Sequence, residues 1–484
     1  MRPQNLLFIL SDEHTRDISA CYGHPIVKTP NIDRLAARGT RFTAAYTNCP
    51  ICVPARASLQ TGRFVADNRC WDNAHPYHGQ LPSWGHRLRE QGHLAVSIGK
   101  LHFRSADDFN GFAEEQMPLH VVEGRGDLLG SIRRPKLLDR KNIKSLAREL
   151  GPGESGYAGY DRRIRNAACE WLRTRAKQQT KPWILFVSFV KPHFPLIAPP
   201  DFFRLYDPAK LPMPRLYSEP DRSTHPVIKA LRSCMNYDDF FESSDRVKLA
   251  LANYLGMVSF LDDNIGQVVT ALEEAGLADN TRVLYTTDHG DNQGVRGLWG
   301  KSVHYEEAAA IPMILAGADV PANRVARTPV SLVDCYQTIL ESVGAKPHSE
   351  DASLPGRSLF EFTGHDDLER VVLGEYHAAA SITACYMLRK GRWKYMHYVG
   401  YRPQLFDLED DPGETRDLGE SAVHAEVRRM LEMELRKLID PEAVCEAAFR
   451  DQEATIARNG GIDAVKARGD FGHSPVPGEK PEFA

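Results

Sequence analysis

The sequence predicts an α/β protein, with a large, mostly parallel central sheet flanked by helices and a smaller C-terminal subdomain of antiparallel sheet plus helix. Up to about residue 360, short apolar runs alternate with stretches of helical periodicity, which is typical of a parallel sheet covered on both faces. Beyond residue 365 the pattern changes to short strands around a tight turn, followed by one amphipathic stretch. We therefore expect two units, residues 1–365 and residues 366–484, the second ending in an extended tail.

Four predicted strands of the large sheet end in ionisable residues. The apolar runs cover residues 6–10, 94–98, 183–190 and 283–287, and they lead into Ser-Asp-Glu-His, Gly-Lys-Leu-His, Lys-Pro-His and Asp-His-Gly-Asp. Because the carboxyl ends of parallel strands meet at the edge of a sheet where ligands bind, these side chains are expected to form one site. The alternative is that each strand merely meets polar residues where it leaves the core.

Helices are predicted between these strands from capping signals and apolar spacing. Residues 31–38 follow Thr-Pro, and residues 264–275 follow Asp-Asp; each stretch is followed by glycine. In the second unit, short strands are expected at 384–387 and 393–397 around a turn at Lys390-Gly391, and Gln-Leu-Phe-Asp-Leu at 404–408 follows them. A helix is expected at 422–439 and a tail at 472–481. The tail is expected either to fray or to wrap around a neighbouring subunit, which would suit a homo-oligomer.

The composition argues against nucleic acid and membranes as partners. Hydrophobic residues make up 42% of the chain and charged residues 26%, and the formal net charge is −4, so no strongly basic surface is expected. No apolar run has the length of a membrane span, and the run at residues 6–10 is too short for a signal peptide. With nine dispersed cysteines, these features predict a cytoplasmic protein.

Cys52 opens the most informative run of the chain, Cys-Val-Pro-Ala-Arg-Ala-Ser-Leu-Gln-Thr-Gly-Arg. Pro54 suits the first turn of a helix and Gly62 suits its end, so Cys52 is expected just before a helix N-terminus. Backbone N–H groups and the helix dipole favour an anion there, and Arg56 adds a positive charge one turn along. Two other interpretations stay open: a redox or zinc-binding Cys-x-x-Cys formed with Cys49, and a buried structural cysteine.

This run resembles the region around the modified cysteine of type I sulfatases, in the alkaline phosphatase superfamily, because Cys-x-Pro-x-Arg is followed by Thr-Gly-Arg. The resemblance implies an alkaline-phosphatase-like fold. It also implies that a maturation enzyme oxidises Cys52 to formylglycine, an aldehyde that hydrates to a geminal diol. The resemblance extends from Asp12 to the C-terminal strands, and the pattern is closest to members like choline sulfatases and phosphonate monoester hydrolases.

The same resemblance implies one divalent metal, held by Asp12, Asp288, His289 and an oxygen of the modified Cys52. Carboxylate oxygens with one imidazole suit Ca²⁺, Mn²⁺ or Mg²⁺ without deciding among them. The chain departs from the commonest sulfatase pattern, Asp-Asp and Asp-Asn, by having Asp12-Glu13 and Asp288-His289. We therefore expect Glu13 to approach the substrate and not the metal.

Five further residues take expected roles from the resemblance. Lys100 and Lys301 are expected to bind sulfate oxygens, and Asn73 to bind the substrate through its amide. His193 matches the acid that protonates the leaving group, which suits a side chain whose ordinary pKa lies near working pH. His102 is expected to deprotonate the second hydroxyl of the sulfated intermediate, so that sulfate is expelled. For each of them the alternative is an ordinary loop or surface position.

Three functions stay open from the sequence. The first is a sulfuric ester hydrolase that acts on a small sulfate ester and depends on the formylglycine-generating maturation enzyme. The second is a phosphonate monoester or phosphodiester hydrolase on the same scaffold, which Asp288-His289 permits. The third is a catalytically silent binding protein, or a chain left unmodified at Cys52. For substrate specificity, Glu375 is expected to face a cationic headgroup such as choline, and the other candidate pocket residues are His75, Tyr77, His78 and His377.

Overall fold

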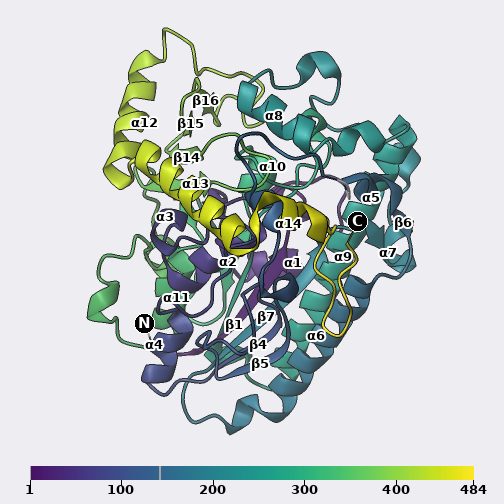
Figure 1. Ribbon diagram of the computed structural model, residues 1–484. Coiled ribbons are helices and arrows are strands. Elements are labelled where there is room, and N and C mark those ends of the chain that lie inside the picture. Colours follow the sequence, from purple (N-terminus) through teal and green to yellow (C-terminus); the bar gives the residue numbers. More distant parts are fainter. Residues whose placement is uncertain (1, 141–142, 484) are drawn as a thin grey trace.

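The computed structural model describes residues 2–140 and 143–483. An eight-stranded sheet forms the centre of the molecule, with helices on both faces, and a separate four-stranded sheet lies at one end (Figure 1). The predicted fold class is therefore confirmed, including the smaller antiparallel sheet.

The large sheet is mostly parallel. Its strand order is β11-β2-β10-β9-β1-β7-β4-β5, and β10 runs antiparallel to both of its neighbours whereas the other neighbouring pairs are parallel. The strands are β1 (Asn5–Asp12), β2 (Gly39–Phe42), β4 (Ala95–Lys100), β5 (Glu114–Leu119), β7 (Ile184–Pro192), β9 (Thr281–Thr287), β10 (Met313–Ala316) and β11 (Arg324–Ala326).

Helices cover both faces of this sheet. α2 (Cys52–Thr61), α4 (Trp84–Glu90) and α11 (Asp334–Val343) pack on one face, and α1 (Pro30–Ala37), α6 (Gly156–Thr174) and α9 (Ser244–Glu274) pack on the other. Because successive strand side chains point to opposite faces, Phe8 of β1 joins the first core and Ile9 joins the second. Burial on both faces explains why the strands are continuous apolar runs in the sequence.

Helix α9 is longer than the sequence predicts. It begins at Ser244, whereas the prediction began it at residue 264, after an Asp-Asp pair that resembles a helix start. In the structure Asp262 caps a different helix, because its carboxylate accepts the backbone N–H groups of Asn31 and Ile32 in the first turn of α1. The capping signal therefore acts through the tertiary structure and not on the helix that follows it.

The C-terminal subdomain has the predicted antiparallel sheet with a packed helix. Strands β13 (Val371–Tyr376), β14 (Cys385–Lys390), β15 (Trp393–Tyr398) and β16 (Gln404–Asp407) pair in consecutive order, and α12 (Ala425–Leu438) packs on them. Two helices that the sequence did not predict follow, α13 (Pro441–Arg458) and α14 (Gly461–Arg468). They run back from α12 across the front of the molecule in Figure 1 and pack near Leu128 and Ile132 of the first unit.

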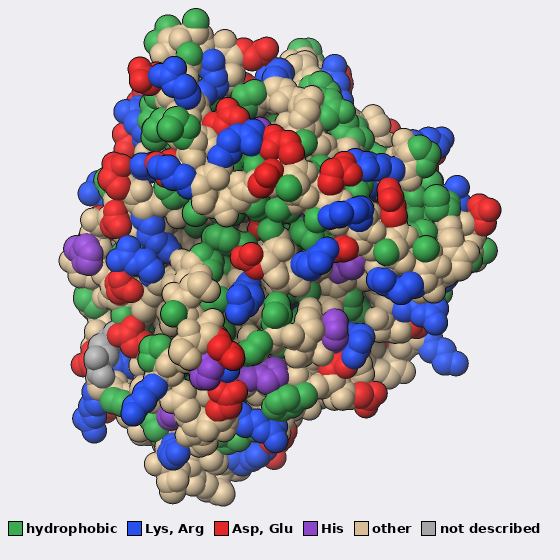
Figure 2. Space-filling view, turned by 60° about the vertical axis from the view of Figure 1, so that its left-hand side comes forward, with side chains coloured by type: hydrophobic (Ala, Val, Ile, Leu, Met, Phe, Trp, Pro, Cys, Tyr) green, Lys and Arg blue, Asp and Glu red, His purple; other side chains and the backbone are tan. Residues whose placement is uncertain are grey.

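The remaining elements are short. Two small sheets pair β3 (Ala45–Tyr46) with β12 (Val330–Ser331) and β6 (Gly151–Pro152) with β8 (Ile197–Ala198), and the short helices include α3 (Val65–Asn68), α5 (Ile143–Arg148), α7 (Pro200–Phe203), α8 (Pro226–Cys234) and α10 (Glu306–Ala309). On the face shown in Figure 2, cationic and acidic side chains are interspersed, in keeping with the small net charge. Within residues 2–140 and 143–483, no helix is both long enough and apolar enough to cross a bilayer.

Candidate active site

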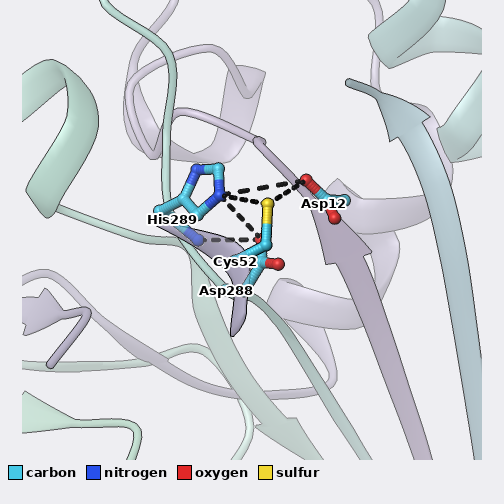
Figure 3. A group of neighbouring side chains, drawn as sticks. All are labelled: Asp12, Cys52, Asp288 and His289. Carbon is cyan, nitrogen blue, oxygen red and sulfur yellow. Dashed lines mark hydrogen bonds and ion pairs between the residues drawn. The ribbon is translucent and has the colours of Figure 1, made fainter. Parts of the chain in front are cut away.

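The structure brings the ionisable residues at the strand ends together at one edge of the large sheet. Asp12 is the last residue of β1, Lys100 is the last residue of β4, and Asp288 directly follows β9. Cys52 begins α2 and lies within this group, with its Sγ 3.7 Å from Asp12 Oδ1 and 3.1 Å from His289 Nε2 (Figure 3). Residues that are up to 277 positions apart in the sequence, Asp12 and His289, thus share one site.

Helix α2 fixes the position of Cys52. Ile51 before it has extended backbone, and Gly62 ends the helix in the left-handed conformation, with a φ of 66°. A Cβ added at Gly62 would lie 2.9 Å from the Tyr336 ring, so this close approach also requires glycine. Every residue of α2 is buried, and the packing around the helix therefore holds Cys52 at the strand ends.

Four side chains form a candidate metal centre: Asp12, Cys52, Asp288 and His289 (Figure 3). One potential ligand atom from each lies within 4.8 Å of the others, and all four residues are buried. His289 Nδ1 lies 3.0 Å from the carbonyl oxygen of Gly290, so Nδ1 carries the proton and Nε2 presents a lone pair to the cluster. Two carboxylates and one imidazole nitrogen are a donor set that fits a hard divalent cation.

Cys49 takes no part in this centre. It belongs to neither group of residues with metal-ligand spacing in the described part of the chain, and both it and Cys52 are free thiols. A reactive redox cysteine needs a lowered thiol pKa. Burial, followed by the charge of Asp12, instead raises the pKa of Cys52 to about 12, and burial holds the pKa of Cys49 well above its usual value. The structure therefore gives no support to a redox or zinc-binding pair.

Arg56 forms ion pairs with both carboxylates of the metal centre, Asp12 and Asp288. Its Nε is 2.7 Å from Asp288 Oδ2, and a terminal nitrogen is 3.2 Å from Asp12 Oδ2. Lys100 Nζ lies 2.5 Å from the same Asp12 oxygen. Burial opposes ionisation of Asp12, but Lys100, His193 and Arg56 outweigh it and hold the pKa of Asp12 well below its usual value. Asp12 is thereby kept ionised, as a carboxylate ligand of a metal must be.

Replacing Arg56 by methionine is expected to lower the free energy of unfolding of the metal-free protein by about 3–5 kcal/mol, because two buried carboxylates lose their shared cation. Chemical denaturation measures the change. The matched control is Arg173→Met, which breaks an ion pair between two largely exposed side chains and is expected to leave the midpoint unchanged. An unchanged midpoint for Arg56→Met would contradict the structural role of this buried pair.

One cavity of about 120 Å³ adjoins the metal centre. Six of the predicted site residues line it: Cys52, Asn73, Lys100, His102, His193 and Lys301. Its other walls are largely aromatic or apolar and include Ile51, Tyr157, Phe194, Tyr237 and Trp299. Arg56, Glu13 and Glu375 are not among its lining residues. Asn73 is held at the N-terminus of α2, because its Oδ1 accepts the backbone N–H of Val53 at 3.1 Å.

His193, Lys301 and Glu13 form a buried chain of polar contacts. His193 Nδ1 lies 2.7 Å from the carbonyl oxygen of Phe194 and therefore carries the proton, while Nε2 accepts from Lys301 Nζ at 2.8 Å. Lys301 also donates to Glu13 Oε2 at 2.7 Å. Burial, and next the charge of Lys301, holds the pKa of His193 well below its usual value, and burial raises the pKa of Glu13 to about 8. Glu13 therefore contacts Lys301 and His193 and does not line the cavity, and its expected approach to the substrate stays a prediction.

His102 lines the same cavity and has a strained backbone. Its φ is 59°, in the left-handed region that residues other than glycine rarely adopt. Its Nε2 is 3.0 Å from the hydroxyl of Ser474, and its buried Nδ1 has no hydrogen-bond partner among the described residues. Burial, and next the charge of Lys100, holds the pKa of His102 well below its usual value, so the ring is neutral in the free protein.

Glu375 does not line the cavity. It lies on β13, is only 1% exposed, and its carboxylate contacts the backbone N–H of Ala66 and the ring of His377. His377 is fully buried against Trp71, so neither residue faces the cavity. Of the other specificity candidates, Tyr77 is buried, and His75 and His78 line a separate surface cavity near α13. Burial therefore keeps Glu375 away from the cavity, and the structure gives no support to its expected contact with a cationic headgroup.

Sequence reasoning missed the residues that reach the cavity from the last part of the chain. Phe471, Gly472, His473 and Ser474 line it, and Tyr157 on α6 supports them. These residues carry no motif, and they follow an unpredicted pair of helices. Without the two helices α13 and α14, no pattern in the sequence places this segment beside a site more than 370 residues earlier in the chain.

A comparison with protein families matches residues 4–345 to the family described as sulfatase. This chain belongs to the sulfatase family. A second match, described as the C-terminal part of N-sulphoglucosamine sulphohydrolase, covers residues 294–441 and includes the four-stranded sheet. The four residues of the candidate metal centre lie within the range of the first match, whereas the cavity also has lining residues beyond it, Ala379 and residues 470–474.

Curated relatives of this sulfatase are themselves sulfatases. A choline-sulfatase from Rhizobium meliloti (strain 1021) is 30% identical over 424 residues, which covers 86% of this chain and 82% of the relative. Arylsulfatase K from Canis lupus familiaris is 29% identical over 463 residues, covering 90% and 82%. The family and these relatives support sulfate ester hydrolysis and place the chain among the hydrolases.

Solved structures share the fold of this sulfatase. A phosphonate monoester hydrolase of Agrobacterium radiobacter superposes with a TM-score of 0.72 at 23% identity, covering 90% of this chain and 95% of the other. A protein in complex with its substrate D-glucosamine-2-N,6-O-disulfate also gives 0.72, at 22% identity, covering 94% and 99%. At such identities the likeness establishes the fold and leaves the substrate open.

Proposed function

We propose that this sulfatase hydrolyses a sulfate monoester to an alcohol and sulfate, with residue 52 oxidised to formylglycine and one divalent metal bound beside it. The observation that carries the proposal is the position of Cys52 at the N-terminus of α2, 3.1 Å from His289 and beside Asp12. The hydrated formylglycine supplies an oxygen nucleophile at that position. A protonated, buried thiol offers no comparable nucleophile.

Asp12, Asp288 and His289 would hold the metal together with residue 52. Ca²⁺, Mn²⁺ or Mg²⁺ would lower the pKa of a bound hydroxyl and neutralise charge on the sulfate oxygens. The fit rests on the buried donor set and on the neutral Nε2 that His289 turns toward it. Arg56 would hold the two carboxylates in position for the metal, because it forms an ion pair with each of them.

The other predicted site residues that line the cavity would bind the sulfate group or transfer protons. Lys100 and Lys301 bring positive charge to the sulfate oxygens, which stabilises charge that develops in the transition state. An anionic ester in the cavity would raise the pKa of His193, opposing the effect of burial, and His193 protonated at Nε2 would give that proton to the leaving oxygen. His102 would accept a proton on the side of residue 52 when sulfate departs. Asn73 would donate from its amide nitrogen.

A phosphonate monoester or phosphodiester hydrolase is the second candidate. The observation that favours it is the pair Asp288-His289, together with the likeness in fold to a phosphonate monoester hydrolase. The cationic side chains of the cavity suit either tetrahedral oxyanion. The curated relatives weigh toward sulfate, because both are sulfatases over more than four fifths of this chain.

The proposal implies a maturation enzyme as partner. Cys52 is 1% exposed and every residue of α2 is buried, so we expect conversion before the chain has folded completely. A homo-oligomer and a cytoplasmic location remain predictions from the sequence.

Replacing His193 by alanine is expected to reduce kcat/KM by about 10²–10⁴-fold for an alkyl sulfate, because the leaving alkoxide then departs without a proton. An aryl sulfate with a strongly acidic phenol should lose much less. Steady-state kinetics on the two esters measures the difference, and His78→Ala, an exposed histidine outside the cavity, is the control. Equal losses on both esters would show that His193 does not protonate the leaving group.

A further inference from the structure

The C-terminal segment, residues 470–476, crosses the catalytic unit of its own chain and forms one wall of the active-site cavity. Figure 1 shows the last part of the chain leaving α14 and looping over α6 and α9. Five of its residues line the cavity that is also lined by Cys52: Asp470, Phe471, Gly472, His473 and Ser474. The sequence predicted a frayed tail or one wrapped on another subunit, and the structure shows a third arrangement, in which the tail packs on its own active site.

Contacts at three points hold this segment. Asp470 forms an ion pair with Arg140 at 2.7 Å. The Tyr157 hydroxyl on α6 donates to the carbonyl oxygen of Ser474 at 2.6 Å, and Val476 of the segment packs into the core cluster that contains Tyr157. Ser474 is itself buried. The backbone at Ser474 is therefore held by contacts on both sides of it along the chain.

The Ser474 hydroxyl contacts the imidazole of His102. The distance from Oγ to Nε2 is 3.0 Å, and in the described part of the chain this is the one hydrogen bond of the His102 ring. The other ring nitrogen, Nδ1, is buried and unpartnered. A histidine nitrogen can accept a proton only while it carries a lone pair, and which nitrogen does so is decided by the hydrogen bond at the other.

We propose that Ser474 is a positioning residue for His102, so that the C-terminal segment completes the active site. The Ser474 oxygen accepts from Nε2–H, which leaves Nδ1 as the nitrogen that takes up a proton. Once it has done so, both ring nitrogens are donors, and the Ser474 oxygen remains a matching acceptor for one of them. This inference rests on the proposed function, because it assigns a proton-accepting task to His102.

The backbone of His102 is also held in a fixed, left-handed conformation. A residue at a φ of 59° persists where its surroundings hold it there, and the backbone N–H of His102 is fixed by the carbonyl oxygen of Leu119 at 2.8 Å. The backbone thus fixes where the side chain begins, and Ser474 fixes the orientation of the ring.

Kinetics of Ser474 variants test the inference. Ser474→Ala is expected to reduce kcat for an aryl sulfate by about 10–100-fold with little change in KM, the size typical of removing the partner that orients a functional histidine. Ser474→Thr retains a hydroxyl and is expected to recover most of kcat. Lys480→Ala, further along the same tail, is the control and should match the wild-type chain. Equal kcat for Ser474→Ala and wild type would overturn the proposal.

A second readout does not depend on turnover. Nitrogen NMR of histidine-labelled protein, with Cys52 unconverted and metal removed, reports which ring nitrogen of His102 carries the proton, and a His102→Gln variant assigns the signal. The wild-type chain is expected to show the Nε2–H form, and Ser474→Ala is expected to shift the population toward Nδ1–H. A wild-type Nδ1–H form, or no change in Ser474→Ala, would contradict the proposed orientation.

The two readouts separate this inference from the proposed function. If Cys52→Ala keeps full activity, the proposed function fails, whatever the NMR spectrum shows. If Cys52→Ala is inactive while Ser474→Ala matches wild type in kcat and in tautomer, the positioning role of Ser474 fails alone.

Discussion

Replacement of Cys52 by alanine is expected to abolish sulfate ester hydrolysis and to leave the fold intact. The proposed nucleophile is made from this side chain, so its removal should cost on the order of 10⁴–10⁶-fold in kcat, comparable with the loss of the nucleophile in other enzymes that use covalent catalysis. Only one sulfur atom is removed from a site that borders the cavity, which limits the effect on packing. Hydrolysis of an aryl sulfate and a thermal unfolding curve measure the two effects.

Cys49→Ala is the matched control for this experiment. Cys49 belongs to the same Cys-x-x-Cys, is equally buried, and lies outside the metal centre, so its variant should retain activity. The intact mass of the peptide that contains residue 52 shows in parallel whether the wild-type cysteine has been converted to formylglycine. Full activity of Cys52→Ala, or of a wild-type preparation that contains cysteine alone at this position, would exclude the proposed mechanism.

Loss of the metal is expected to have the second largest effect. Chelation should remove activity, and adding back Ca²⁺, Mn²⁺ or Mg²⁺ should restore it, with the most effective ion identifying the native one. Asp12→Asn should lose more than about 100-fold in kcat, since outer partners of metal ligands alone contribute about 10–100-fold. Asp12 also forms ion pairs with Lys100 and Arg56, so this variant removes a carboxylate partner from two buried cationic side chains.

Asp262→Asn separates loss of metal from loss of stability. Asp262 is a buried aspartate of the same domain, but it caps α1 and lies outside the metal centre. Both variants are expected to unfold more easily, whereas only Asp12→Asn should lose metal, which elemental analysis of the purified protein measures. Metal content and activity of Asp12→Asn equal to those of wild type would contradict the assignment of the centre.

The residues around the metal centre could be found from the sequence because each follows a recognisable strand. Asp12, Lys100 and Asp288 stand where buried apolar runs end, and parallel strands bring such ends to one edge. The helix that begins with Cys52 has its own local signals, Pro54 in the first turn and Gly62 at the end. Local sequence patterns are therefore enough to predict the strand ends and the helix start that carry the metal-centre residues.

Other parts of the site depend on contacts that no local pattern records. Asp262 looks like the start of a helix, yet it caps another helix more than 200 residues away in the sequence. Glu375 lies within β13, a strand of the second sheet, and is buried away from the cavity. Ser474 lies in a segment rich in proline and glycine, whose position is set by Arg140 and Tyr157.

A comparison of kcat/KM for an aryl sulfate and the matching aryl phosphonate monoester tests the central claim most directly. The enzyme should be metal-loaded, converted at residue 52, and accompanied by its Cys52→Ala variant as the blank. Sulfate ester hydrolysis predicts that the sulfate is preferred by a large factor and that the variant hydrolyses neither ester. A higher kcat/KM for the phosphonate would contradict the account and assign the same site to phosphonate monoester hydrolysis.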